Sequence, residues 1–170
     1  MIKIKTDNAE YVVTPTIFPD GTSQVWKLPE DVFRSSHMLV TWNFESEREV
    51  IDLLSLRKLL PNPAYTLSLH VPYLPYGRQD KAVSNWATFN IRVLADLINS
   101  MDFYRVTSVD VHNPEETAVF INRFKNIKVT EAEEREGLLQ TIFENGKVCN
   151  TQTLSEIRAR LLSNLTKAKT

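Results

Sequence analysis

The sequence predicts an α/β domain whose mainly parallel sheet has helices on both faces and an antiparallel hairpin at its edge. Short apolar runs alternate with helix-like segments from residue 37 to residue 130. Such alternation gives right-handed crossovers and parallel neighbouring strands. The first 28 residues instead contain short runs of Ile, Val and Thr around a turn, which is typical of hairpins. At 170 residues, the chain suits one domain, with at most a small annex.

The opening strands are predicted at residues 1–5, 10–17 and 23–28. Pro19, Asp20 and Gly21 form a turn between the last two, because Pro presets φ and Gly adopts a positive φ without steric cost. We therefore expect an antiparallel hairpin region at a sheet edge.

The later elements continue the alternation. Residues 37–42 are expected to form a buried strand, and Ser46 with Glu49 has the spacing of a capping box that opens a helix. Pro61-Asn62-Pro63 ends that helix. The remaining expected elements are a strand at 65–71, a helix at 87–101, a strand at 106–111, a helix opened by Asn113, Pro114 and Glu116, and a strand at 126–130.

Composition excludes several classes of protein. The formal net charge of -1 argues against a general nucleic-acid binder. The single cysteine, Cys149, excludes an internal disulfide and a thiolate-rich metal site. No signal peptide, membrane-spanning run or phosphate-loop glycine pattern is present. These features predict a soluble cytoplasmic protein with no membrane or nucleic-acid partner.

Two polar clusters follow neighbouring predicted strands. The stretch HVPYLPYGRQDKAVSN, residues 70–85, leaves the carboxyl end of the strand at 65–71, and Asp110 and His112 lie at the carboxyl end of the strand at 106–111. Ligands of open α/β sheets bind outside the carboxyl ends of the strands. We therefore expect both clusters to contribute to one site.

The first cluster has the chemistry of an anion site. Arg78 offers a planar charged fork that suits phosphate oxygens, and Lys81 offers a mobile point charge. Asp80 could hold their geometry or approach a metal, and Tyr73 and Tyr76 could stack on a base. The alternative is a solvated loop whose charges pair with one another.

The histidines have different expected roles. His112 could be a metal ligand or a proton carrier, or a histidine at a helix entry that bonds the backbone. His37 and His70 fall within predicted strands, where packing is their expected role.

The motifs VPYLPYGRQDK, VTSVDVHNPE and FPDGTSQV resemble the amino-terminal half of the ribose-phosphate pyrophosphokinases, in matching order over roughly residues 10 to 130. Gly77 and the DVHNPEE segment look more like bacteriophage members of that family than cellular ones. The resemblance implies a three-layer, phosphoribosyltransferase-like α/β domain over residues 1–132. It also implies transfer of pyrophosphate from MgATP to ribose 5-phosphate, giving phosphoribosyl pyrophosphate and AMP.

The resemblance also implies roles for individual residues. His112 corresponds to a histidine that helps to hold Mg²⁺ at the ATP phosphates, and Phe18 and Asp20 would contact adenine across a subunit interface of a homo-oligomer. The full set of implied ATP contacts is Phe18, Asp20, Arg78, Gln79, Asp80 and Lys81. Thr22 stands where the family usually has glutamate.

The tail differs from the family. Nothing after residue 130 resembles the ribose-phosphate-binding loop of the second synthetase domain. Residues 137–165 instead resemble the carboxyl end of nicotinamide phosphoribosyltransferase, which suggests a gene fusion and a link to NAD metabolism. We therefore expect a helical tail at 133–170 that covers exposed sheet surface.

Two functions are compatible with these features. The first is a MgATP-binding, synthetase-like half that lacks the ribose 5-phosphate side and is incomplete alone. The second is a non-catalytic relic or regulatory module that assembles with a full-length synthetase.

Overall fold

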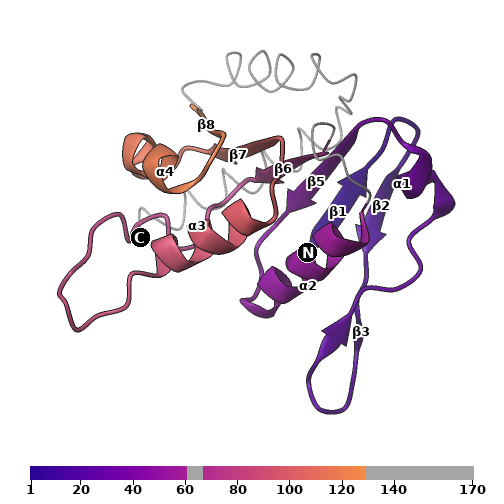
Figure 1. Ribbon diagram of the computed structural model, residues 1–170, viewed down its shortest axis with the longest axis horizontal. Coiled ribbons are helices and arrows are strands. Elements are labelled where there is room, and N and C mark those ends of the chain that lie inside the picture. The colour runs from indigo at the N-terminus through magenta and orange to yellow at the C-terminus, as the bar shows by residue number, and fades with distance from the viewer. Residues whose placement is uncertain (61–66, 129–170) are drawn as a thin grey trace, which may run out of the picture. The chain divides into compact units, whose positions relative to one another are not determined.

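The computed structural model describes residues 1–60 and 67–128, and Met1–Ile127 form one compact unit (Figure 1). The strands of the main sheet are β1 (Ile2–Lys5), β2 (Glu10–Val13), β5 (Met38–Trp42), β6 (Leu67–Val71), β7 (Arg105–Val109) and β8 (Phe124–Ile127). Their order across the sheet is β2-β1-β5-β6-β7-β8. The tail predicted at 133–170 and its expected cover of the sheet lie outside the described residues.

The sheet is mainly parallel, as the sequence predicts. Strands β5 to β8 pair in parallel, whereas β1 is antiparallel to both β2 and β5. The β1–β2 hairpin therefore forms an antiparallel edge, and the predicted α/β class is confirmed. No helix in the described ranges is long and apolar enough to cross a membrane.

The strand predicted at 10–17 is split in two. Pro15 separates β2 from β3 (Thr16–Ile17), since proline has no N–H to donate to a ladder. β3 pairs only with β4 (Ser23–Gln24), which is shorter than the predicted strand at 23–28, and together they form a separate projecting hairpin. The predicted turn is present: Gly21 has a φ of 85° and donates its N–H to the Phe18 carbonyl at 2.9 Å.

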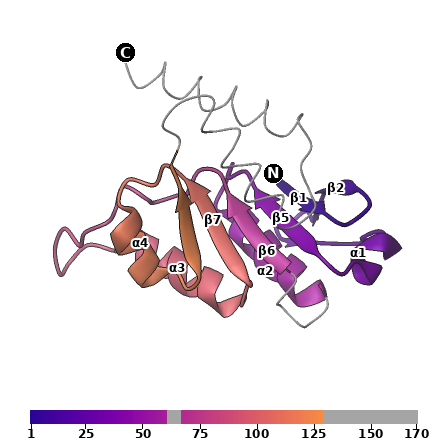
Figure 2. The same ribbon diagram turned by 90° about the horizontal axis from the view of Figure 1, so that it is seen from above.

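Three helices pack on one face of the sheet: α2 (Arg48–Leu59), α3 (Asn90–Ser100) and α4 (Pro114–Phe120) (Figure 2). The parallel strands follow one another in a single direction across the sheet, so each right-handed crossover places its helix on the same side. The amino ends of these helices consequently lie at the edge where the parallel strands end. The sequence predicts helices on both faces, whereas these three described helices cover one.

Several local predictions are corrected. Half of the predicted capping box is present: Ser46 N–H donates to Glu49 Oε2 at 3.4 Å, but α2 has Glu47 as its N-cap and no side-chain cap bond. Glu49 also accepts hydrogen bonds from Trp42 Nε1 at 3.1 Å and Glu45 N–H at 2.8 Å. Burial alone would raise the pKa of Glu49, but these bonds and one from the amino terminus lower it. His37 precedes β5 and is exposed, so packing is not its role. Element bounds also differ: α3 begins at Asn90 and β8 ends at Ile127.

A short helix, α1 (Glu30–Arg34), was not predicted. It spans five residues, too few to show helical periodicity. Its Asp31 carboxylate accepts hydrogen bonds from Thr6 Oγ1 at 2.6 Å, Asn8 Nδ2 at 2.7 Å and the Tyr11 hydroxyl at 3.2 Å. These bonds fix α1 to the β1–β2 hairpin and lower the pKa of Asp31.

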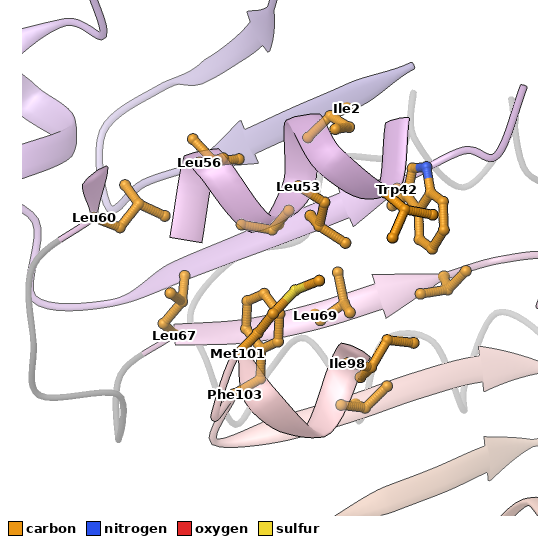
Figure 3. Close-up of a cluster of buried hydrophobic side chains, with 14 of the residues drawn as sticks. Ile2, Trp42, Leu53, Leu56, Leu60, Leu67, Leu69, Ile98, Met101 and Phe103 are labelled. Atoms are coloured by element: carbon orange, nitrogen blue, oxygen red, sulfur yellow. The ribbon is translucent and has the colours of Figure 1, made fainter. Parts of the chain in front are cut away.

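The core lies between the sheet and these helices. Leu53 and Leu56 of α2 and Ile98 of α3 pack towards Leu67 and Leu69 of β6 (Figure 3). The other residues labelled in the close-up are Ile2, Trp42, Leu60, Met101 and Phe103, all of them buried. This layer supports the two strand ends that carry the candidate site.

Shortening a core side chain in β1 should measurably destabilise the domain. Ile4 is completely buried, and we expect Ile4→Val to lower the free energy of unfolding by about 1 kcal/mol. Urea denaturation measures the change. Ile51→Val is the matched control, because Ile51 in α2 is 56% exposed and should change stability little. Equal losses in both variants would contradict the described burial.

Candidate functional site

The loop that follows β6 folds tightly against the sheet edge before its charged residues begin. Leu74 and Pro75 are buried, and Gly77 N–H donates to the Leu74 carbonyl at 3.2 Å. Tyr76 adopts a left-handed conformation, with a φ of 60°, and its carbonyl accepts from Gln79 N–H at 2.8 Å. Arg78 lies within this turn, which therefore fixes the position of its backbone.

Two side-chain hydrogen bonds tether this turn to the helices beside it. The Tyr76 hydroxyl donates to Glu47 at the amino end of α2. At the other end, Asp80 Oδ2 accepts from Asn113 Nδ2 at 3.1 Å, and Asn113 is the N-cap of α4. The loop therefore spans the carboxyl edge of the sheet from α2 to α4.

The electrostatics agree with these tethers. The hydrogen bond from Asn113 lowers the pKa of Asp80, with smaller contributions from the charges of His112 and Lys81. The hydrogen bond to Glu47 raises the pKa of Tyr76. Asp80 is therefore the carboxylate that faces both clusters, and His112 lies within its electrostatic reach.

The two cations of the loop, Arg78 and Lys81, are exposed to solvent, as is Gln79 beside them. Among the described residues, neither Arg78 nor Lys81 forms an ion pair. The loop is therefore solvated, as the alternative expects, but its cations form no ion pair with its own carboxylate. Two cationic side chains remain accessible to an anion.

The second cluster follows β7. Asp110 has a φ of 45° and its N–H donates to the Ile127 carbonyl at 2.9 Å, so the chain turns sharply where the strand ends. Val111 N–H donates to Asn126 Oδ1 at 3.0 Å. The exposed His112 follows and immediately precedes the α4 N-cap. The structure thus brings His112 to the loop carrying Arg78, through the contact between Asp80 and Asn113.

A metal could be held here only together with a ligand. In the parts of the chain that the structure describes, no three His, Cys, Asp or Glu residues are grouped to bind a metal ion. Mg²⁺ prefers octahedral oxygen coordination and usually binds through one or two carboxylates, with water and substrate phosphates as its other ligands. Asp80 and Asp110 are the carboxylates beside His112, so Mg²⁺ here would take most of its ligands from a polyphosphate and water.

Phe18 and Asp20 lie away from this loop. They occupy the turn of the β3–β4 hairpin, which projects at the opposite end of the described sheet from the loop at 77–89 (Figure 1). Asp20 Oδ1 accepts from Thr22 N–H at 3.0 Å and from Thr22 Oγ1 at 2.7 Å. Phe18 is 38% exposed. Neither residue forms a hydrogen bond or ion pair with Arg78 among those that the structure describes.

Two structural features of the site were not anticipated. Ser23 donates to the buried Asp52 of α2, which holds the projecting hairpin in place. Asn113 was expected only as a helix cap, yet its amide also tethers the loop. The sequence shows only that Asn113 has a side-chain NH₂ group, which can still donate a hydrogen bond when the side-chain oxygen caps the helix.

Sequence comparisons identify relatives at modest identity. No family model matches the chain. The chain is similar to a ribose-phosphate pyrophosphokinase of Saccharolobus solfataricus, with 27% identity over 111 residues, covering 64% of this chain and 38% of the relative. A ribose-phosphate pyrophosphokinase of Mycoplasmopsis pulmonis is 29% identical over 120 residues, covering 69% of this chain and 35% of the relative. The chain thus spans just over a third of the length of these relatives.

A solved structure shares the fold. The phosphoribosylpyrophosphate synthetase from Mycobacterium smegmatis superimposes with a TM-score of 0.55 and 20% sequence identity. The match covers 78% of this chain and 43% of that chain. The predicted synthetase-like α/β fold is therefore confirmed.

Proposed function

We propose that this chain binds MgATP at the carboxyl edge of its sheet, as the nucleotide side of a ribose-phosphate pyrophosphokinase-like site. The observation that carries the proposal is the Asp80–Asn113 hydrogen bond. It joins the loop of Arg78 and Lys81 to the segment of His112. Two accessible cations and an imidazole at one sheet edge suit a nucleotide polyphosphate. Similarity to ribose-phosphate pyrophosphokinases supports the same ligand.

Each residue has a distinct proposed role. Arg78 and Lys81 bind phosphate oxygens, Gln79 contacts the nucleotide beside them, Asp80 holds the geometry of the loop, and His112 helps to hold the Mg²⁺ that accompanies the phosphates. In phosphoryl transfer, charge spreads over phosphate oxygens, where cations stabilise it. The family resemblance implies that ribose 5-phosphate binds to a loop of the second synthetase domain, and no segment of these 170 residues resembles that loop. We therefore propose that this chain alone does not complete turnover.

Isothermal titration calorimetry with MgATP tests the proposal. We expect saturable binding that needs Mg²⁺, and no AMP release when ribose 5-phosphate is added. Without positioning of the second reactant, most of the rate enhancement is missing. Absence of MgATP binding would overturn the nucleotide site. Release of AMP would show instead that a complete site exists.

We further propose that Phe18 and Asp20 act on a neighbouring subunit of a homo-oligomer. The hairpin that carries them exposes Ile17 and Phe18, and Trp26 just after it is also exposed. These apolar side chains would be covered by contact with a second copy, which would bring Phe18 to the adenine bound by that copy's Arg78.

Mixing two defective variants tests this shared site. Oligomers that contain only Phe18→Ala chains, or only Arg78→Ala chains, should bind MgATP more weakly than the natural protein. After mixing and exchange of subunits, about a quarter of the sites should bind normally, because a mixed pair of chains contains one intact site. Calorimetry of the mixture counts those sites. Recovery of none, despite mixed oligomers by mass spectrometry, would place both residues in one chain's site.

The second candidate function is a non-catalytic module that assembles with a full-length synthetase. The exposed apolar hairpin favours it, because such a surface suits a related subunit as well as a second copy. This candidate predicts a stable complex with a purified full-length ribose-phosphate pyrophosphokinase in sedimentation experiments, and no MgATP binding by this chain. Nucleotide binding without such a complex would favour the first function.

A further inference from the structure

The carboxylate of Asp80 forms its hydrogen bond with Asn113 rather than with either accessible cation. Its Oδ2 accepts a hydrogen bond from Asn113 Nδ2 at 3.1 Å, and it forms no ion pair with Arg78 or Lys81. Asp80 is half-buried, whereas Arg78, Gln79 and Lys81 beside it are exposed. The loop thus contains one side chain that faces α4 and three that face solvent.

Asn113 is itself fixed. Its Oδ1 accepts from Glu116 N–H at 3.2 Å, which caps α4, and its backbone carbonyl accepts from Thr117 Oγ1 at 2.8 Å. The cap bond sets the orientation of the amide, so its Nδ2 is directed to Asp80. An anchor of this kind on α4 restrains the loop more strongly than a contact with a mobile surface side chain.

The Tyr76–Glu47 bond restrains the loop on the other side of Arg78. Only Gly77, Arg78 and Gln79 lie between the tethered residues Tyr76 and Asp80. Beyond Asp80, all residues from 81 to 88 are exposed, and Trp86 is 98% exposed. The tethers therefore separate a fixed turn from a segment with few contacts, and Arg78 belongs to the fixed turn.

We propose that Asp80 is a positioning residue that does not contact nucleotide or metal, and that with Asn113 it fixes the turn presenting Arg78 to a polyphosphate. This inference rests on the proposed MgATP site and assigns Asp80 a role other than the direct ATP contact that the family resemblance implies. Fixing the turn before binding removes part of the entropy cost of ordering it around the ligand.

Exchanging the two side chains tests the assignment. Asn113→Ser keeps a cap for α4 and removes the bond to Asp80 without adding charge. Asn113→Asp also keeps the cap but places two carboxylates together. The double variant Asp80→Asn/Asn113→Asp restores a donor and an acceptor in reversed order, with the net charge of the natural pair. Asp80→Asn alone keeps an acceptor oxygen for Asn113.

MgATP affinity by calorimetry should follow the hydrogen bond. We expect each Asn113 variant to bind about 10-fold more weakly, and both Asp80→Asn and the exchanged pair to bind within about 3-fold of the natural chain. A purely structural effect on α4 would not be restored by the exchange. If Asp80→Asn binds as weakly as Arg78→Ala and the exchange restores nothing, Asp80 touches the ligand and the inference is wrong.

Limited trypsin digestion tests the anchor without nucleotide. Cleavage after Arg78 should become several-fold faster in Asn113→Ser and Asn113→Asp, and return to its natural rate in the exchanged pair. Cleavage after Lys27, in a loop that Asn113 does not contact, serves as the reference within each digest. Unchanged cleavage after Arg78 would refute the anchor. Failure of the natural chain to bind MgATP, with cleavage rates as expected, would refute the proposed function alone.

Discussion

Replacing Arg78 by alanine should weaken MgATP binding on the order of 100-fold, which corresponds to about 3 kcal/mol. Arg78 is exposed and forms no ion pair within the described residues, so its guanidinium is available to the phosphates. Hydrogen bonds between charged groups contribute more than neutral ones, and a guanidinium can form two at once. Calorimetric titration with MgATP measures the loss.

Two further variants make this result specific. Arg78→Lys keeps the charge but not the planar fork, so its affinity should lie between those of the natural chain and Arg78→Ala. Arg34→Ala is the matched control: Arg34 is also exposed, but it lies on α1 and pairs with Glu30. The unfolding free energy should stay nearly constant in all three. Equal binding by Arg78→Ala and the natural chain would remove Arg78 from the site.

The meeting of the two polar clusters could be predicted because it depends only on topology. β6 and β7 are parallel neighbours, so the segments after Val71 and Val109 must emerge at the same edge. The alternating pattern that defines those strands is visible in the sequence. The same topology places α2, α3 and α4 on one face, whereas the sequence predicted helices on both faces, because the strand pattern does not give the order of the strands.

The tethers of the loop could not be predicted in the same way. Asp80 and Asn113 are 33 residues apart, and Tyr76 and Glu47 are 29 apart, so no local pattern pairs them. A capping asparagine uses its oxygen, and the partner of its NH₂ group depends on tertiary structure. The break at Pro15 differs, because the missing N–H of proline was visible in the sequence and should have ended the predicted strand at 10–17.

The capping box predicted for Glu49 is only part of its role. Glu49 accepts from Ser46 N–H at 3.4 Å, as the spacing predicts, but Trp42 and the amino terminus also donate to its carboxylate. Long-range partners of a buried carboxylate can outweigh a local motif, because each hydrogen bond offsets part of the desolvation cost. Glu49 therefore joins β5 to the start of α2, and local sequence alone does not reveal that role.

The domain should lose stability between neutral and acidic pH because of His70. Its side chain in β6 is 2% exposed, and Nδ1 lies 2.8 Å from Thr107 Oγ1 of β7. Burial lowers the pKa of His70 from 6.5 to about 4. Below a pH of about 6.5 the unfolded chain therefore takes up a proton that the folded chain binds only near pH 4, so acid favours unfolding. The contribution of His70 to stability is present above this range and falls as the pH decreases through it.

The size of this effect follows from the shift in pKa. Each pKa unit corresponds to roughly 1.4 kcal/mol, so His70 should make the free energy of unfolding roughly 2.5 kcal/mol smaller near pH 4.5 than near pH 7. Carboxylates also titrate over this range, and comparison with His70→Asn separates their contribution. The variant should lose less stability on acidification by about that amount, whatever its stability at neutral pH. His37→Asn is the control, since His37 is exposed and should leave the pH profile unchanged. Parallel urea-denaturation profiles for His70→Asn and the natural chain would show that His70 is protonated as readily in the folded domain as in the unfolded chain.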